Sequence, residues 1–342
     1  MISIGNNLVS KKQLRSDTVA GYIKAINTLR ELRGLGKAID IGSRKCSSAI
    51  LYRNIKAEED IARRRQPLTD ETVTVITKKA KESHRDSLEA LVGDIIRVAS
   101  QIGPRAAEIV QKTSSNYDVH TYPSGKKVIK AMTSSNFRFL TAKGRLIKAT
   151  SVKNRKLVRK MKQTWPIQKN RRNNEELTYL TNDENPDLCV INGALGMIDR
   201  AARLEQDPNL PFAVYENTQG NMTYLTTKKL TDYIRNCTKQ AHPDMPEQEL
   251  QLYSCHSMRV WACMLLHQMG KSGDYIRVRL RWLSEAYRVY LRDSEVSAKQ
   301  HNEALSGTGN KIRHMLNNQI LPEEVHYVVD EDEDMGDYVD LD

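Results

Sequence analysis

The chain has 342 residues, and 53 lysines and arginines against 42 aspartates and glutamates give it a formal net charge of +11. Apolar residues make up 39% of it, which suffices for a sizeable core, but no run of about 18 of them could form a membrane span. The cysteines are odd in number and lack framework spacing, which excludes a secreted disulfide scaffold and predicts a reducing, intracellular compartment. These are Cys46, Cys189, Cys237, Cys255 and Cys263.

The charge is unevenly distributed along the chain. Residues 322–342 carry ten acidic residues and no lysine or arginine, so the preceding residues carry a net charge of +21. A strongly basic body attracts polyanions such as nucleic acid. We expect residues 322–342 to form an acidic, disordered tail, as a solubilising segment in the simpler interpretation or as a mimic of nucleic acid. The basic run over residues 152–172 could face DNA, act as a nuclear import signal, or form a solvated hairpin.

The N-terminal part predicts one helix and a boundary. Apolar residues recur near a period of 3.6 over residues 17–34, and Gly34 and Gly36 then end the pattern. Residues 37–66 show no such period and are predicted to be irregular. Three arginines followed by Pro67 mark the boundary, so residues 1–66 are expected to form a separate helical segment.

Helices are predicted to begin the main part of the chain. Thr69 can cap an amphipathic helix that runs to about residue 83, and a second apolar pattern covers residues 85–101. Gly103 and Pro104 break this second helix, and Pro104 suits the first turn of a further helix over residues 105–111.

A small sheet and further helices are predicted to follow. Residues 117–180 look β-rich, because turn signals separate short strand-like segments. The turns are expected at residues 123–125, 142–144 and 168–174, and the strands at residues 136–140, 163–167 and 177–180. Beyond them we expect a helix over 187–204, a hairpin over 212–225, a helix from Thr226 to about 240, and helices over 248–318. The order of helices, small antiparallel sheet and helices predicts an α+β fold that is mainly α.

Four separated segments carry the chemistry. They read GPRAAE at residues 103–108, QKN at 168–170, CHSMRV at 255–260 and RWLSEAYRVYLR at 281–292. Together they resemble the tyrosine recombinase (phage integrase) family, whose signature is an H-x-x-R pair, a later tyrosine, and a His or Trp eight or nine residues before that tyrosine. His256, Arg259, Trp282 and Tyr290 fit this signature, and the last segment is most similar to recombinases of eukaryotic mobile elements.

The resemblance covers about residues 67–305 and implies both a fold and an activity. The implied fold is a recombinase catalytic domain over residues 67–321, preceded by a helical core-binding module that residues 1–66 could represent in truncated form. The implied activity is site-specific cutting and rejoining of duplex DNA through a 3′-phosphotyrosine intermediate, with no metal, cofactor or ATP. The implied assembly is a tetramer on DNA that exchanges a C-terminal helix, for which residues 295–318 are the candidate. The implied location is the nucleus in a eukaryotic host and otherwise the nucleoid, and no membrane partner is expected.

Each implied catalytic residue has a physical reason. Arg105 and Arg259 would donate paired hydrogen bonds to a phosphate, and His256 lies three residues from Arg259, on the same helix face. Trp282 can donate its indole N–H to a phosphate oxygen, and Tyr290 would attack the phosphorus. Each residue alone could instead serve packing or solvation.

The remaining assignments are less direct. Lys169, on the turn over residues 168–174, is the preferred donor of a proton to the leaving oxygen, with Lys126, Lys127 and Lys143 as alternatives. Arg171 and Arg172 beside it are expected to contact phosphates. Glu108 is expected to support the site through an ion pair or a hydrogen bond. Tyr287 is the alternative nucleophile, but its spacing of five residues from Trp282 does not match the family.

Other functions remain open or are disfavoured. Cys255, Cys263 and His267 lack a CxxC pair and a fourth ligand, so we predict no zinc site. A catalytically inactive DNA-binding protein derived from a recombinase is one alternative function. A DNA-relaxing enzyme like a type IB topoisomerase is another.

Overall fold

The computed structural model describes residues 16–42, 47–58, 64–148, 152–168, 172–282 and 285–291. The chain divides into two compact units, and the division falls between Arg63 and Arg64. The described part of the first unit ends at residue 58, and that of the second runs from residue 64 to residue 291. The acidic segment 322–342 and the exchange candidate 295–318 lie outside the described residues.

The first unit consists of two helices, α2 (Ser16–Leu32) and α3 (Ser47–Glu58), which contact each other. The predicted helix over residues 17–34 is confirmed, and the Asn27 side chain holds the following loop, because its Oδ1 accepts the N–H of Ala38 at 2.9 Å. The prediction that residues 37–66 are irregular is wrong for residues 47–58. The apolar pattern of α3 is weak, so its sequence alone does not predict a helix. Contact with α2 contributes to its stability.

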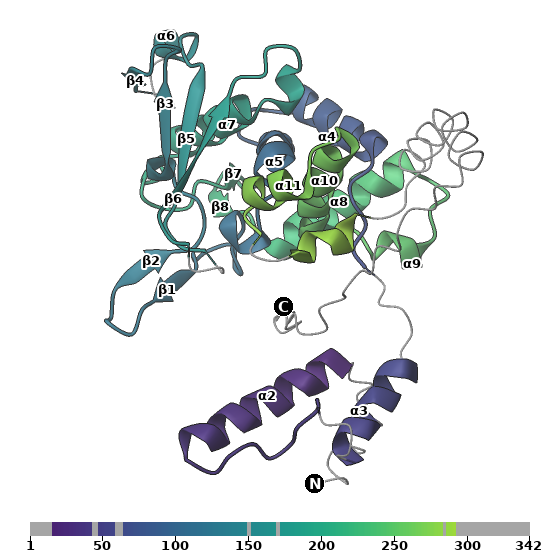
Figure 1. Ribbon diagram of the computed structural model, residues 1–342. Coiled ribbons are helices and arrows are strands. Elements are labelled where there is room, and N and C mark those ends of the chain that lie inside the picture. Colours follow the sequence, from purple (N-terminus) through teal and green to yellow (C-terminus); the bar gives the residue numbers. More distant parts are fainter. Residues whose placement is uncertain are drawn as a thin grey trace, which may run out of the picture. The chain divides into compact units, whose positions relative to one another are not determined.

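The second unit is built around α5 (Leu88–Ile102), whose Ser87 cap accepts the N–H of Ala90 at 3.2 Å. Eleven of its fifteen residues are buried, and the unbroken buried run from Ala90 to Ile96 covers every face of the helix, so α5 lies in the core. It contacts α4 (Asp70–Glu82), α7 (Val190–Arg203) and α10 (Cys255–Gln268), as Figure 1 shows. The two helices predicted before Gly103 are confirmed, including the Thr69 cap.

The helix predicted over residues 105–111 is wrong in extent. Only a short 3-10 turn forms, η1 (Ala106–Glu108). The N–H of Gln111 donates instead to the carbonyl of Leu225 at 2.9 Å, and Gln111 pairs with Thr226 as an isolated bridge. Backbone pairing with this distant segment therefore ends the turn, and the sequence does not announce that pairing.

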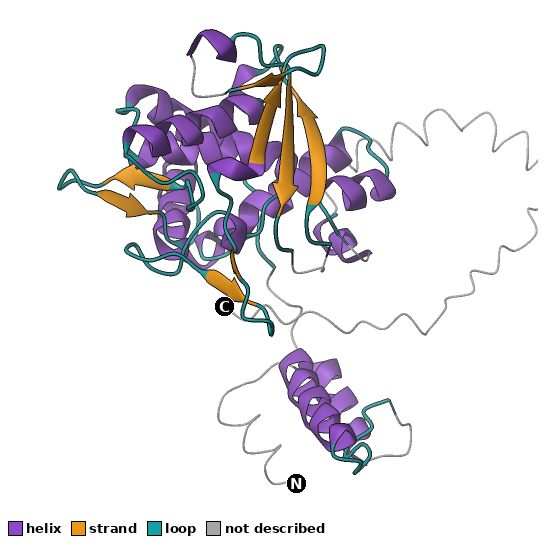
Figure 2. Cartoon of the chain, turned by 90° about the vertical axis from the view of Figure 1, so that its left-hand side faces the viewer, coloured by secondary structure: helices purple, strands orange, loops and turns teal. Residues whose placement is uncertain are grey.

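The sheet lies on one side of the second unit and is antiparallel throughout, with the strand order β4-β3-β5-β6 (Figure 2). Side chains along β5 alternate in burial, with Met161, Gln163 and Trp165 buried, which is the period of a strand with one face on a core. The predicted β-rich region is confirmed, with additional short elements. The elements of this region are β1 (Val119–Thr121), β2 (Lys127–Ile129), η2 (Ser134–Asn136), β3 (Phe137–Leu140), β4 (Leu146–Ile147), α6 (Val152–Arg155), β5 (Lys160–Trp165) and β6 (Glu175–Leu180).

The remaining elements follow the predicted order. Thr226 caps α8, because its hydroxyl accepts the N–H of Lys229 at 3.1 Å. The elements are η3 (Pro186–Leu188), β7 (Val214–Glu216), β8 (Met222–Tyr224), α8 (Thr227–Ala241), α9 (Glu247–Leu250), α11 (Gly273–Arg279) and η4 (Glu285–Tyr290). The α+β fold that is mainly α is thereby confirmed. Among the described residues, no helix has the length and apolar character that crossing a membrane requires.

Two apolar clusters divide the second unit. The larger one joins α5, α7, α8, the first half of α10 and the sheet. The smaller one holds Ala262, Cys263, Ile276, Leu280 and Tyr287, so it ties α11 and η4 to the middle of α10. Helix α10 thus enters both clusters, and they meet at its middle, between Trp261 and Ala262.

Small residues allow α7 to approach α5 closely, and this gives a stability prediction. A Cβ added to Gly193 would lie 2.6 Å from the backbone oxygen of Asp94, which cannot move without displacing α5. We expect Gly193→Ala to lower the free energy of unfolding by about 1–3 kcal/mol. Urea unfolding measures this, with the exposed neighbour Asn192→Ala as a control expected to stay within about 0.5 kcal/mol. Equal effects of the two substitutions would contradict the close approach as the cause.

Candidate active site

The hydroxyl of Tyr290, at the end of η4, lies 2.9 Å from Nε2 of His256. The two rings are 5.4 Å apart. His256 occupies the first turn of α10, and Ser254 fixes the start of this helix, because its hydroxyl accepts the N–H of His256 at 3.2 Å. A capping interaction therefore positions the histidine, and the histidine meets the tyrosine hydroxyl.

Trp282 lies between this pair and Arg259. Its ring centroid is 5.3 Å from that of Tyr290, and Cζ of Arg259 lies 4.2 Å from the centroid of the Trp282 ring. The indole N–H of Trp282 is buried and has no hydrogen-bond acceptor among the residues that the structure describes. The indole N–H groups of Trp165 and Trp261 are likewise buried without an acceptor among the described residues.

Arg259 is buried between the C-terminal ends of two helices. Its guanidinium donates to the carbonyl of Gly103, which ends α5, and to the carbonyl of Leu280, which ends α11, at 2.9 Å for the latter. The last carbonyls of a helix lack partners within the helix and carry partial negative charge, so a buried cation suits this place. Burial lowers the pKa of Arg259 to about 9, helped by the positive charges of Arg105 and Arg281 and opposed by Glu108 and Tyr290.

Arg105 and Glu108 are held by the short turn η1. The backbone N–H of Arg105 donates to one carboxylate oxygen of Glu108 at 2.8 Å, and the Arg105 guanidinium donates to the other at 3.0 Å. The side chain of Arg105 remains 26% exposed, whereas that of Glu108 is 8% exposed. Arg105 can therefore contact an incoming anion, whereas the buried Glu108 can only hold Arg105 in place.

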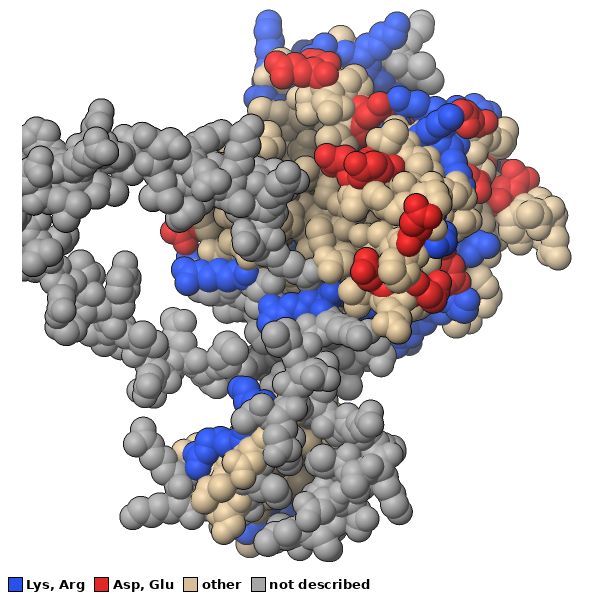
Figure 3. Space-filling view, turned by 90° about the vertical axis from the view of Figure 1, so that its right-hand side faces the viewer, with Lys and Arg blue, Asp and Glu red and all other residues tan. Residues whose placement is uncertain are grey.

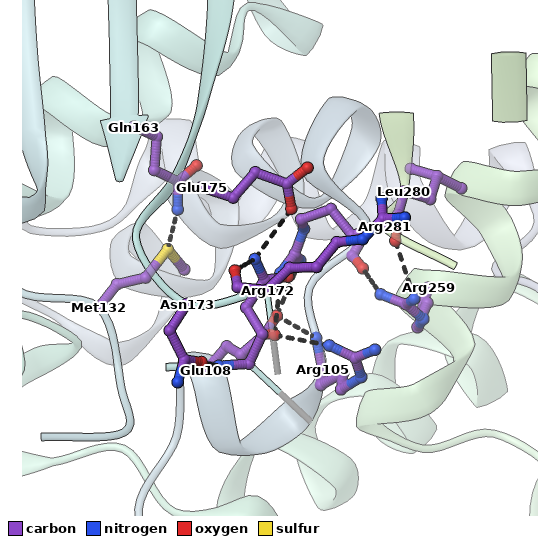
Figure 4. Close-up of polar contacts among 12 residues, drawn as sticks. Arg105, Glu108, Met132, Gln163, Arg172, Asn173, Glu175, Arg259, Leu280 and Arg281 are labelled. Carbon is purple, nitrogen blue, oxygen red and sulfur yellow. Dashed lines mark hydrogen bonds and ion pairs between the residues drawn. The ribbon is translucent and has the colours of Figure 1, made fainter. Parts of the chain in front are cut away.

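Arg281 is a site residue to which the sequence analysis gave no role. Its side chain is fully buried, and it donates to both carboxylate oxygens of Glu108, at 3.0 and 2.9 Å (Figure 4). It also donates to Oε1 of Gln168 at 3.2 Å, and its Cζ lies 3.3 Å from the centroid of the Trp165 ring. The only sequence signal was its place directly before Trp282 in the last motif.

The charge of the cluster is unbalanced. Burial raises the pKa of Glu108, but the charge and hydrogen bonds of Arg281 outweigh this, with contributions from Arg105 and Arg259, and lower that pKa to about 2. One carboxylate then faces three arginines within one cluster. An arrangement with excess positive charge is suited to bind a phosphate.

The lowered pKa of Glu108 gives a prediction about acid stability. Because the pKa falls from 4.5 to about 2 on folding, the charged carboxylate stabilises the fold above pH 4.5, and this contribution is lost as the pH falls towards 2. It corresponds to about 3 kcal/mol. Urea unfolding of wild type and Glu108→Gln between pH 7 and pH 3 should show the difference between them shrinking below pH 4.5. A difference independent of pH would contradict the assignment.

The turn between β5 and β6 is only partly described. Lys169 and Arg171 lie outside the described residues. Arg172 is exposed, and its backbone carbonyl accepts a hydrogen bond from Nε2 of Gln168 at 2.6 Å (Figure 4). The alternative lysines Lys126, Lys127 and Lys143 are exposed.

Tyr287 differs from Tyr290 in its surroundings. It is only 3% exposed and belongs to the smaller apolar cluster. Its hydroxyl packs against Gly273, where an added Cβ would lie 1.9 Å from it. The structure therefore places Tyr290, and not Tyr287, beside His256.

The cysteines of α10 have local partners. The thiol of Cys255 donates to the carbonyl of Thr227 at 3.3 Å, and burial raises the pKa of Cys263 to about 11. In the part of the chain that the structure describes, no three histidine, cysteine or acidic side chains are placed to hold a metal ion.

Basic residues do not dominate every face of the second unit. In the view of Figure 3, acidic and basic side chains of the second unit are intermingled. That face offers no uniform attraction to a polyanion.

Comparisons with known proteins find similarity among solved structures. No family model matches the chain, and no curated protein does. Among solved structures, XerA recombinase is similar with a TM-score of 0.41 and 13% identity, over 87% of this chain and 80% of the other. The Tn1549 transposon integrase is similar in its complex with transposon right end DNA, with a TM-score of 0.46 and 11% identity over 87% and 82%, and in a complex with circular intermediate DNA, with 0.44 and 12% over the same shares. The chain's structural neighbours thus include a recombinase and a transposon integrase, at low sequence identity.

Proposed function

We propose that the protein cuts and rejoins duplex DNA as a site-specific recombinase or integrase of the tyrosine recombinase type, with Tyr290 as the nucleophile. The hydrogen bond of 2.9 Å between the Tyr290 hydroxyl and Nε2 of His256, beside the buried Arg259, carries this proposal. Attack on a phosphodiester needs a nucleophile, a proton acceptor and cationic stabilisation of the transition state. We assign these three functions to Tyr290, His256 and the arginines around Glu108.

In the first step, the Tyr290 oxygen attacks the scissile phosphorus and its proton passes to His256. The bond from phosphorus to the 5′ oxygen breaks, and a 3′-phosphotyrosine diester forms. By resemblance to the family, Lys169 gives a proton to the 5′ oxygen, which leaves as a hydroxyl. One phosphodiester replaces another, so rejoining by a 5′-hydroxyl of a partner strand needs no external energy source.

The arginines stabilise the negative charge that develops on the phosphate oxygens. Arg105 is exposed enough to donate directly, and Arg259 presents its charge from between the two helix ends. The buried indole N–H of Trp282 would find a phosphate oxygen as its acceptor. Preorganised donors of this kind need no reorganisation as the charge develops.

Duplex DNA is the proposed partner, and the net charge of +21 on residues 1–321 supports it. Self-association to a tetramer, an origin in a eukaryotic mobile element and a nuclear location are parts of this proposal that rest on the sequence resemblance alone.

The test is capture of a covalent adduct from a random pool of nicked duplex oligonucleotides, in the presence of a chelator. The nick lets a short fragment diffuse away and so traps the intermediate. We expect a protein–DNA adduct on a denaturing gel, and a nucleotide attached to Tyr290 in the digested protein. An adduct on another residue, or DNA binding without any adduct, would contradict the proposal, and the latter favours an inactive DNA-binding protein.

A second assay separates recombination from simple relaxation. If the protein is a recombinase, it should recombine two copies of the captured sequence that lie on one plasmid. An enzyme of the type IB topoisomerase kind would relax the plasmid and leave the two copies in place.

A further inference from the structure

We propose that Arg281 is a positioning residue that ties Gln168, at the start of the β5–β6 turn, to the carboxylate that holds Arg105. This inference rests on the proposed function. It concerns residues that touch no substrate themselves, since the side chain of Arg281 is fully buried.

The backbone at Arg281 is the first observation. Its φ is +60°, in the left-handed region that a side chain other than that of glycine rarely adopts. The position follows the end of α11, where helices commonly place glycine. An arginine at such a place costs conformational energy, which its side-chain contacts must offset.

Those contacts run in two directions. Towards η1, the guanidinium forms the paired hydrogen bonds with Glu108, and Glu108 holds Arg105. Towards the sheet, it stacks on Trp165 at the end of β5 and donates to Gln168 in the turn that follows. One buried side chain therefore connects two parts of the site that come from distant segments.

Gln168 also forms hydrogen bonds with the described residues that follow the turn. It is 5% exposed, and its Nε2 donates to the carbonyl of Arg172 at 2.6 Å and to Glu175 at 3.0 Å. Its backbone N–H donates to Oδ1 of Asn173 at 2.8 Å. The described residues on both sides of the turn are thus tied to Gln168, which accepts a hydrogen bond from Arg281.

The backbone conformation also directs the next residue. Trp282 follows Arg281 directly and packs on Arg259 and Tyr290, whereas Arg281 faces Glu108 and Gln168. Because of this backbone conformation, the side chain of Arg281 lies against Glu108 and Gln168, and that of Trp282 lies against Arg259 and Tyr290. Protonation of the leaving oxygen, which the sequence assigns to the turn, should depend on Arg281 and Gln168 more than nucleophilic attack does.

The experiment compares two leaving groups on the duplex captured from the pool. One substrate has the natural 5′ oxygen at the scissile phosphate, and the other has a bridging sulfur there, which leaves as a thiolate without a proton from the enzyme. The variants are Arg281→Gly, which suits the backbone, and Gln168→Met, which keeps the pair of Arg281 and Glu108. Lys169→Ala serves as the reference, and Arg279→Gln is the matched control. Arg279 also lies on α11 and also contacts the sheet, through the Thr178 carbonyl at 3.2 Å, but it lies outside the site.

We expect Gln168→Met and Arg281→Gly to slow adduct formation by about 10²-fold with the oxygen substrate, as loss of general-acid catalysis does. With the sulfur substrate, the rate of adduct formation by Gln168→Met should fall by less than about threefold, and so should that of Lys169→Ala. Arg279→Gln should match wild type on both substrates.

Equal losses of Gln168→Met on the two substrates, or no loss on either, would overturn the inference. If Arg281→Gly fails to fold, Gln168→Met decides alone. Absence of any adduct with wild type would instead mean that the proposed function fails, and the inference would fall with it.

Discussion

Covalent strand cleavage is expected to disappear when Tyr290 is replaced by phenylalanine. The substitution removes one oxygen atom and leaves the ring contacts with Trp282 and His256 in place. Loss of a nucleophile leaves only binding and charge stabilisation, so we expect a fall of at least about 10⁴-fold in adduct formation. A denaturing gel with the nicked substrate measures this, and unchanged DNA binding by the variant would show that the site is otherwise intact.

Tyr287→Phe is the matched control for this result. Tyr287 lies three residues earlier in the same turn, but its hydroxyl packs against Gly273 within an apolar cluster. We expect Tyr287→Phe to keep the adduct. Survival of the adduct in Tyr290→Phe and its loss in Tyr287→Phe would move the nucleophile to Tyr287.

Replacement of Arg259 by alanine is expected to slow strand cleavage by about 10³–10⁵-fold, the range found when an arginine is removed from a phosphoryl-transfer site. Arg259→Lys should also be severely impaired. A guanidinium reaches the carbonyls of Gly103 and Leu280 together, and the single ammonium group of lysine cannot reproduce this fork. Single-turnover cleavage of the captured duplex measures both variants.

The control for charge alone is Arg277→Ala. Arg277 lies on α11, where its guanidinium pairs with Asp274 at 3.0 Å, and its side chain is 38% exposed. Its removal should leave the cleavage rate near that of wild type. Near-normal cleavage by folded Arg259→Lys would mean that the charge alone suffices, and it would contradict the role of the two helix ends. Thermal unfolding of each variant separates lost activity from lost structure.

Much of the fold could be predicted because its signals are local. The caps of α4 and α8 are set by Thr69 and Thr226, residues whose hydroxyls bond to the next turn of their own helices. The strands on either side of the β5–β6 turn follow from the turn residues between them. The placing of His256 near Arg259 needs only the spacing of a helix.

The errors and omissions have non-local causes. Residues 105–111 do not continue as a helix, because Gln111 pairs with the segment at Leu225 and Thr226. Helix α3 has a weak pattern of its own and contacts α2. Arg281 could not be recognised from the sequence, because its role depends on Glu108 and Gln168, which lie 173 and 113 residues away along the chain.

The span between Glu108 and Arg281 bears on the order in which the molecule folds. Closing the loop between Glu108 and Arg281 costs conformational entropy before the ion pair can form. Local helices are therefore expected to form early, and ion pairs between distant residues late. A folding intermediate in which α4 and α5 are packed but α11 is not yet docked has Glu108 without its main counter-charge and Arg259 without the Leu280 carbonyl. Such an intermediate has no assembled cluster around Tyr290. The proposed cutting chemistry would therefore be available only to a chain whose second unit has folded completely.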